Sequence, residues 1–364
     1  AKLAFVPAFT FSPQGVITSW DGNKATKTYS LPVQASWSID LFGNLLNVKR
    51  SAQMSLLATK DYQLVVKTGL ISNIANMYYT LMMLDKQLEL VNNMANLTKD
   101  TWNLMKLQKE LGRAKETSVQ SAESNYYSVL AQSADLKRQI RETENSFSLL
   151  LGQPAQTISR GKLENQSLPS EFSTGIGVQL LSNRPDVHYA EMSLAQCFYD
   201  TNQARSRFYP SITISGSGAY TNSGGGGIVN PGKMLWNAVG SLTQPIFAHG
   251  QLIAGLKVAK AKQEQAYNTW QNAVLSAGSE VSNALVLYNS SDEKSKLEAK
   301  QVESLQKNVE YAKMLFSQGQ GTTYLEVITA QQSLLNAQLS KVADDFYKMQ
   351  AVVNLYYALG GGRN

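Results

Sequence analysis

Two hydrophobic patterns alternate along the chain, one typical of strands and the other of long helices. From Tyr29 to Ile39 every second residue is apolar, and the side chains between them are mostly Ser, Gln or Pro. This period of two predicts a strand of about a dozen residues, and transmembrane barrel strands need about 9–11 alternating residues. We predict two strands within residues 3–40, separated by a loop from Ser12 to Lys27.

From residue 43 the pattern changes to that of a helix. Apolar residues step by threes and fours up to a break at Leu111-Gly112-Arg113-Ala114, and a second series continues to Leu151. Such spacing is typical of coiled-coil packing. The sequence therefore predicts an antiparallel hairpin of two long helices over residues 43–151. Residues 152–182 contain Pro154 and Pro169 and are predicted to be a connector.

The second half of the chain repeats this plan. We predict a helix over 185–208, two strands within 209–248 around a glycine-rich loop at 224–227, and a hairpin over 250–358 that breaks at Gly319–Gly321. Ala1–Ser12 aligns with Ala204–Ser215, and five of these twelve positions are identical. A repeat of this length is too long for a solenoid unit. We therefore predict a duplication, with residues 1–182 as the first repeat and 183–364 as the second.

The first repeat begins at the counterpart of Ala204 and so lacks a counterpart of the 185–208 helix. We expect the sequence to be an N-terminally truncated part of a longer chain.

A corner is predicted where the repeats meet, at Arg184, Pro185 and Asp186. Proline fits the first turn of a helix, where no backbone donor is needed, and a carboxylate there complements the helix dipole. The motif is therefore interpreted as structural. The chain has nine prolines, and all of them lie outside the two predicted hairpins, as long helices require.

The composition of the chain argues against several classes of function. The net charge is +6, but the basic residues are scattered, so no nucleic-acid partner is expected. One cysteine, Cys197, excludes an intrachain disulfide. No apolar run approaches the ~18 residues of a membrane helix. The two histidines, His188 and His249, form no triad or metal-spaced cluster. We expect no catalytic residues, no metal and no cofactor, and interpret the chain as not an enzyme.

Four motifs carry a resemblance to a known family. They are Arg184-Pro185-Asp186-Val187 followed by Ala190-Glu191, Phe208-Tyr209-Pro210-Ser211, Pro245-Ile246-Phe247, and Gly321-Thr322-Thr323-Tyr324-Leu325-Glu326-Val327 with Ala330-Gln331. Together with the duplicated strand and helix plan, they make the whole chain resemble the TolC-like outer membrane efflux proteins.

The resemblance implies a mixed fold, with long coiled-coil hairpins and a transmembrane β-barrel shared by a homotrimer, four strands per chain. The helices would form a periplasmic tunnel, closed at its far end by an iris. The implied partners are outer membrane lipid, a periplasmic adaptor protein and an inner-membrane pump, in the outer membrane of a Gram-negative cell. The number of strands also predicts an oligomer, because four strands cannot close a barrel and open edges are not tolerated in lipid.

The resemblance also implies site residues. Breaks in the hairpins would form the tips that contact the adaptor, at Leu111, Gly112, Arg113, Gly319, Gly321 and Thr322. Relatives commonly carry two acids at the aperture. Glu326 occupies the first of these positions, whereas Thr329 occupies the second and departs from the pattern. Many relatives carry an acylated N-terminal cysteine, which the mid-chain Cys197 cannot be, so lipidation stays open.

The leading hypothesis is a passive export duct for drugs or other small toxic molecules. The alternative is the duct of a protein (type I) secretion system, which shares this architecture and differs in its pump. A purely structural coiled coil of the cell envelope is disfavoured by the alternating strands, because a spacer needs no barrel.

Overall fold

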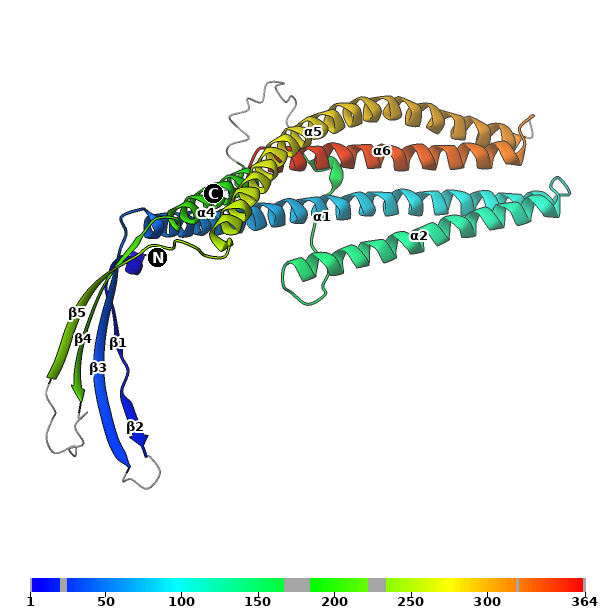
Figure 1. Cartoon of the computed structure of the whole chain (residues 1–364). Helices are drawn as coiled ribbons and strands as arrows, with labels where there is room; N and C mark the ends of the chain where they lie inside the picture. Colours follow the sequence, from blue (N-terminus) through cyan, green and yellow to red (C-terminus); the bar gives the residue numbers. More distant parts are fainter. Residues whose placement is uncertain (1, 20–24, 167–183, 222–233, 319–320, 363–364) are drawn as a thin grey trace. The chain divides into compact units, whose positions relative to one another are not determined.

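The computed structural model of the chain describes residues 2–19, 25–166, 184–221, 234–318 and 321–362. Its residues form two compact units (Figure 1). The first unit comprises residues 1–63 and 185–274, and the second comprises 64–184 and 275–364. The predicted glycine-rich loop at 224–227, most of the predicted connector, and Gly319 lie outside the described residues.

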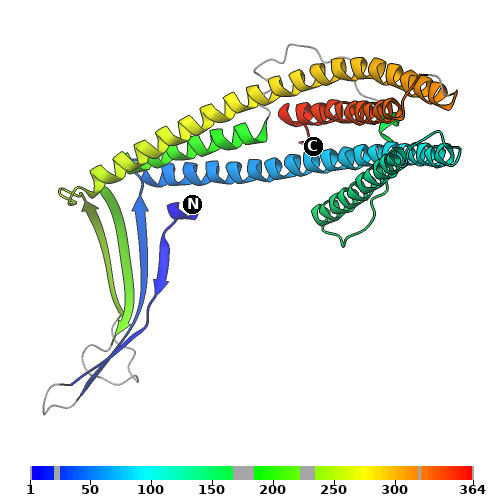
Figure 2. The same ribbon diagram turned by 90° about the vertical axis from the view of Figure 1, so that its right-hand side faces the viewer.

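An antiparallel sheet makes up the strand part of the first unit. Its strands are β1 (Ala8–Phe11), β2 (Gln14–Thr18), β3 (Thr26–Ile39), β4 (Ser211–Thr221) and β5 (Met234–Thr243). Their order is β1-β3-β4-β5, and β2 also pairs with β3. Because β1 and β2 pair with successive parts of β3, they share one strand position, and the sheet has four positions across its width (Figure 2).

Three details of the predicted strands are wrong. Residues 2–5 form a 3-10 helix, η1 (Lys2–Phe5), so the first strand begins at Ala8 and not at residue 3. The predicted loop from Ser12 to Lys27 contains β2, which resumes pairing after Pro13; proline has no N–H to donate, and the ladder is broken there. The last strand, predicted over about Leu235 to Phe247, is Met234–Thr243 and ends two residues before Pro245.

Three helices continue the first unit. These are α4 (Pro185–Ser206) and the first parts of α1 (Asn44–Glu110) and α5 (Gln251–Gln318). The carboxylate of Asp61 on α1 lies 2.6 Å from His188 Nδ1 on α4, and Ser51 on α1 donates to Asp200 on α4 at 2.7 Å. On its other side, α4 reaches α5 through Thr201, whose hydroxyl donates to the carbonyl of Ala259 at 3.2 Å. Helix α4 therefore lies between α1 and α5.

Four long helices form the second unit. The rest of α1 pairs with α2 (Glu116–Leu150), and the rest of α5 pairs with α6 (Tyr324–Ala358) (Figure 1). A short 3-10 helix, η2 (Leu163–Asn165), lies in the connector. Val91 of α1, Val129 of α2 and Leu335 of α6 share one buried cluster. The predicted helical steps therefore mark real core positions, and the hairpin bounds agree with prediction to within a few residues.

Within the part of the chain that the structure describes, none of the helices combines the length and apolar character needed to cross a membrane.

Candidate functional site

The sheet has one apolar face and one polar face. Residues paired across antiparallel strands lie on the same face, and the register places Leu31 opposite Tyr220, Trp37 opposite Ile214, and Ile39 opposite Ile212. Ile212 in turn pairs with Leu242 of β5. The apolar alternation that the sequence shows in β3 is thus matched strand by strand, and this face of the sheet is apolar from Tyr29 to Ile39.

The other face carries rows of small polar side chains. One row is Ser38, Thr213 and Ser241, and another is Gln34, Ser217 and Asn237. The Ser217 hydroxyl donates to the Asn237 side-chain oxygen at 2.9 Å. Among the strand residues that the structure describes, Lys27 alone is charged, and its pairing with Ile17 places it on the opposite face, at the start of β3. This polar face suits contact with water. Within these described strands it has no charge that would attract a ligand of either sign.

The apolar face is exposed in the single chain. Phe9 is 73% exposed, Trp236 76% and Leu242 67%. A contiguous exposed apolar surface of this kind marks contact with lipid or with another protein. Its position opposite a polar face is the pattern of a strand that lies between lipid and a water-filled interior.

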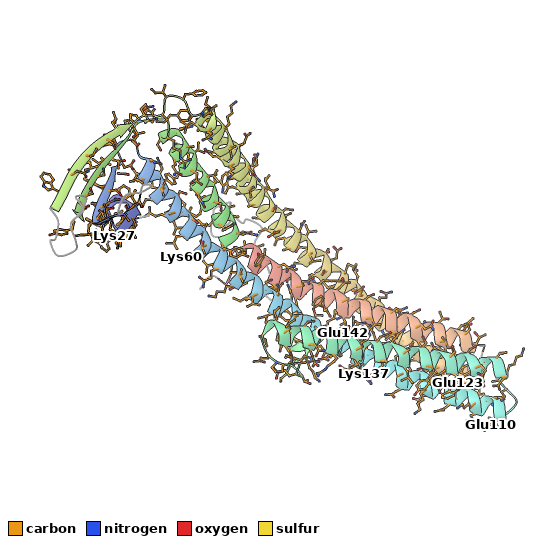
Figure 3. All side chains as sticks on the ribbon, turned by 60° about the horizontal axis from the view of Figure 1, so that its bottom comes forward. Lys27, Lys60, Glu110, Glu123, Lys137 and Glu142 are labelled. Atoms are coloured by element: carbon orange, nitrogen blue, oxygen red, sulfur yellow. The ribbon has the colours of Figure 1, made fainter. Side chains whose placement is uncertain are left out.

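The tip between α1 and α2 is built by a glycine. Gly112 has φ +69°, and its N–H donates to the carbonyl of Lys109 while the N–H of Arg113 donates to that of Gln108. This pair of bonds is a Schellman motif, which favours glycine because its middle residue is left-handed. Leu111 and Arg113 are exposed beside it. The outer end of the hairpin is visible in Figure 3, where Glu110 and Glu123 are labelled.

The tip between α5 and α6 holds the predicted gate residues. Glu326 lies in the first turn of α6 and is exposed. Thr329 is one turn further, and its hydroxyl donates to the carbonyl of Leu325 at 2.8 Å. Both residues line a cavity of about 440 Å³ together with Tyr311 and Leu325. Gly321 has φ +65° and Thr322 is half-buried. The two predicted gate positions therefore lie on one side of one helix end.

The corner predicted at Arg184, Pro185 and Asp186 has a structural role. Pro185 is the first residue of α4 and Asp186 lies in its first turn. The guanidinium of Arg184 is 2% exposed; it donates to the carbonyl of Ala358, the last residue of α6, and pairs with Glu280 at 2.7 Å. A helix C-terminus has unpaired carbonyls and a partial negative charge. Arg184 therefore caps α6 and ties it to α5.

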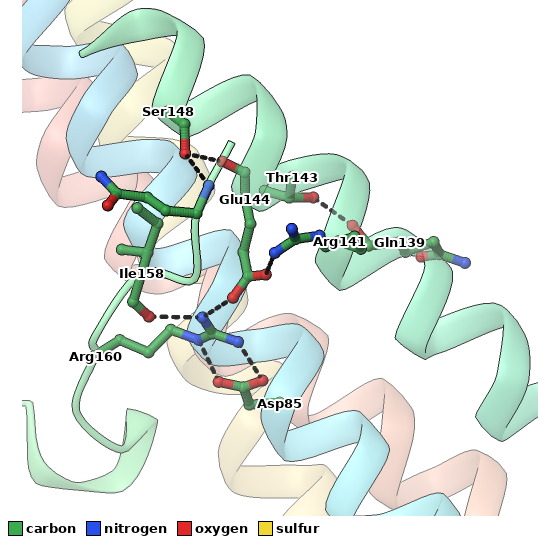
Figure 4. Close-up of polar contacts among 9 residues, drawn as sticks. Asp85, Gln139, Arg141, Thr143, Glu144, Ser148, Ile158 and Arg160 are labelled. Atoms are coloured by element: carbon green, nitrogen blue, oxygen red, sulfur yellow. Dashed lines mark hydrogen bonds and ion pairs between the residues drawn. The ribbon is translucent and has the colours of Figure 1, made fainter. Parts of the chain in front are cut away.

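A partly buried ion-pair network that the sequence analysis missed anchors the connector (Figure 4). Arg160 makes two bonds to Asp85 of α1, at 2.5 and 2.8 Å, and one to Glu144 of α2, at 2.7 Å. Glu144 also pairs with Arg141 at 3.3 Å. The side chains of Arg160 and Glu144 are 11% and 6% exposed, and removing one partner of a pair buried in this way typically costs about 3–5 kcal/mol, because a buried charge is left alone. Arg160 thus fixes the connector to the α1–α2 pair.

The network shifts the pKa of its members. The hydrogen bonds to Asp85 raise the pKa of Arg160 above its usual range despite burial. Burial alone would raise the pKa of Glu144, but the bonds from Arg160 and Arg141 outweigh it and hold that pKa below its usual range. Both groups are therefore charged at neutral pH, which is what a structural clamp needs.

The histidines have structural surroundings. His188 lies in the first turn of α4 against Asp61, and His249, with φ +49°, precedes the start of α5. Within the described residues, no group of three or more His, Cys, Asp or Glu side chains could hold a metal ion. Cys197 is half-buried in α4, and burial raises the pKa of its thiol.

Comparison with known proteins agrees with this geometry. The family described as "Outer membrane efflux protein" matches residues 1–153 and 176–361. The chain is 27% identical to the cation efflux system protein CusC of Escherichia coli, over 94% of this chain and 76% of that protein. It is also 27% identical to the toluene efflux pump outer membrane protein TtgI of Pseudomonas putida, over 92% of this chain and 71% of that protein.

Solved structures show the same fold. The crystal structure of CusC superposes with a TM-score of 0.90 at 24% identity, over 99% of this chain and 84% of that chain. VceC of Vibrio cholerae superposes with a TM-score of 0.90 at 21% identity, over the whole of this chain and 89% of that chain.

Proposed function

Since the chain belongs to the outer membrane efflux protein family, we propose that it is the outer membrane duct of a tripartite efflux system and exports small toxic molecules. The protein lies in the outer membrane and extends into the periplasm. The relatives are named as components of cation, solvent and toluene efflux. Small solutes are therefore the substrate class that we propose for this chain.

The observation that carries the proposal is the sheet with two unlike faces. An apolar face suits the hydrocarbon of a membrane, and a face of Ser, Thr, Gln and Asn suits a water-filled passage. A lining that is polar and nearly uncharged lets solutes of either sign pass. Four strand positions leave two open edges, so three chains would complete one barrel.

We propose that the hairpin tips receive the other components. Leu111, Gly112 and Arg113 at one tip and Gly321 and Thr322 at the other are on short turns whose glycines have positive φ. Gly319 belongs to the same proposed tip and lies outside the described residues. A periplasmic adaptor would bind at these turns and connect the duct to an inner-membrane pump.

We also propose that Glu326 lies at the aperture, with Thr329 beside it. Three chains would bring three carboxylates together at a narrow mouth, and acidic rings favour cations in channels. Because Thr329 has no charge, the ring would hold a single layer of acids.

The proposal is tested by efflux with altered tips. In cells that lack their own duct but contain the cognate adaptor and pump, the full-length protein should restore resistance to a toxic solute. The double variant Gly112→Val, Gly321→Val should lose this resistance, because valine rarely adopts positive φ and both turns would be rebuilt. The amount of assembled oligomer in the membrane should stay unchanged.

A matched control uses two glycines inside the long helices α1 and α5, which lead to these tips. A side chain added at Gly69 or Gly278 would meet open space, and neither glycine has positive φ, so Gly69→Val, Gly278→Val should keep resistance. Full resistance in the tip variant would place adaptor binding elsewhere. Failure of the unaltered protein to restore resistance would overturn the proposed function itself.

A further inference from the structure

Positive charge is concentrated in the unit that contains the strands. Residues 1–63 and 185–274 include twelve Lys and Arg against seven Asp and Glu, a net charge of +5 out of +6 for the chain. Seven of these cations lie within the first twelve residues of α1 and α5 or around the last turn of α4, at Lys49, Arg50, Arg205, Arg207, Lys257, Lys260 and Lys262. The helix ends next to the sheet are therefore basic.

Two of these cations line one groove, and a third lies beside one of its aromatic rings. A cavity of about 750 Å³ lies between α4 and α5, with Leu194, Phe198 and Tyr267 among its apolar lining and with Arg205 and Lys260 at its polar positions. Tyr199 also lines it, and the guanidinium of Arg50 on α1 is 5.8 Å from the Tyr199 ring centre. Three helices thus place cations around one aromatic surface.

The groove is polarised along its length. Helix α4 runs toward the sheet, so Arg205 is near the sheet and Glu191 is far from it. Helix α5 runs away from the sheet, so Lys260 precedes Glu264 in the same direction. Glu191 therefore lies at the distant end, and Glu264 lies one helical turn beyond Lys260. The end next to the sheet has cations and aromatic rings.

We propose that this basic end binds the phosphate of an anionic phospholipid headgroup on the periplasmic surface of the outer membrane. Arg205 lies one residue before the end of α4, and Lys260 follows the start of α5 by about 14 Å of helix. Basic side chains near an anionic membrane surface attract its lipids, and aromatic rings anchor proteins at that depth. The assignment rests on the proposed placement of the sheet in the membrane.

The opposite side of the same helix pair supports the choice of face. There Arg207 and Lys262 line a smaller cavity of about 190 Å³, beside Asp200 and Gln203. That side lacks the aromatic lining of the groove. As in the sheet, the apolar side is the one suited to lipid and the polar side to the water-filled passage.

Lipid binding to the detergent-solubilised full-length protein tests this site. Dioleoyl-phosphatidylglycerol is titrated in a neutral sugar detergent and counted by native mass spectrometry, with dioleoyl-phosphatidylcholine as the uncharged comparison. Each basic residue near an anionic surface contributes a factor of about five in affinity, so Arg205→Gln, Lys260→Gln should bind phosphatidylglycerol roughly thirtyfold more weakly. Its weak binding of phosphatidylcholine should not change.

The control pair Arg207→Gln, Lys262→Gln removes the same charge from the other side and should bind as the unaltered protein does. If both pairs of substitutions weakened binding equally, net charge alone would explain the effect, and the proposed site would be overturned. Equal binding of the two lipids by the unaltered protein, or displacement by inorganic phosphate alone, would also overturn it. No transport is measured, so a failed efflux test and a failed lipid test are distinguishable.

Discussion

The prediction about gating concerns the exposed carboxylate of Glu326. Glu326 lies at the start of α6 beside Thr329, in a cavity close to the hairpin tip. If three such groups surround the aperture, Glu326→Gln should modestly lower the preference for cations. Reversal potentials in planar bilayers under a salt gradient measure this. Glu293→Gln, which removes an exposed acid from α5 away from that cavity, should leave the potential unchanged. If Glu326→Gln also left it unchanged, Glu326 would only stabilise the helix start.

Single residues were predictable where a local rule governs them. The first-turn roles of Pro185 and Asp186 follow from helix-start chemistry, and both are seen. The partners of Arg184 and the whole Arg160 network join residues far apart in the chain, such as Arg160 and Asp85. Nothing in the spacing of those residues indicates that they meet, because the meeting depends on how the helices pack.

Strand register gives a prediction at the scale of one element. Gln34 and Ala35 are neighbours in β3 and lie on opposite faces of the sheet, paired with Ser217 and Gly216 of β4. Ala35→Arg puts a charge on the apolar face and should cost about 2–4 kcal/mol if that face meets lipid near the midplane. Gln34→Arg should be tolerated on the polar face and should increase anion selectivity.

Assembly into the outer membrane measures this difference, with the amount of heat-modifiable oligomer as the readout. Equal assembly of Ala35→Arg and Gln34→Arg would show that the apolar face does not meet lipid. Because both variants introduce the same side chain at adjacent positions, a general effect of arginine on expression cancels.

The helices and strands were predictable where a single hydrophobic period extends along the whole element. The hairpins extend for many turns with steps of three and four residues, and the observed helices end within a few residues of the predicted breaks. The strand β2 was missed because Pro13 interrupts its alternation and a Gly, Asn and Asp-containing stretch follows it. This segment is a strand because it pairs with β3, and the residues of the segment alone do not indicate that pairing.

At the scale of the molecule, the duplication stays a prediction that several features support. The helices of the two hairpins have 67 and 35 residues in one half and 68 and 35 in the other. Gly43 and Gly250, both with positive φ, precede the two long helices. The compact units nevertheless do not coincide with the repeats, because each unit takes strands or helices from both halves. The predicted repeats in the sequence are therefore not the compact units of the structure.

The edges of the sheet require that several chains assemble. One edge consists of β1 and β2 and the other of β5, and within the described chain neither edge has a further strand beside it. In lipid each unpaired backbone group would cost several kcal/mol, so the β5 edge must pair with the β1 and β2 edge of another copy. Since relatives of this family share the fold, we expect a ring of three chains.

Cysteine cross-linking in the full-length protein tests this closure. In a Cys197→Ser background, Thr10→Cys on β1 is combined in turn with Asn237→Cys, Val239→Cys or Ser241→Cys on β5, all on the polar face. One combination should give covalent dimers and trimers, because facing cysteines in adjacent strands are within reach of a disulfide. Ala238→Cys lies on the apolar face and should not cross-link with Thr10→Cys. A stable monomer that conducts ions would contradict the trimer, since its two edges would then be open to lipid.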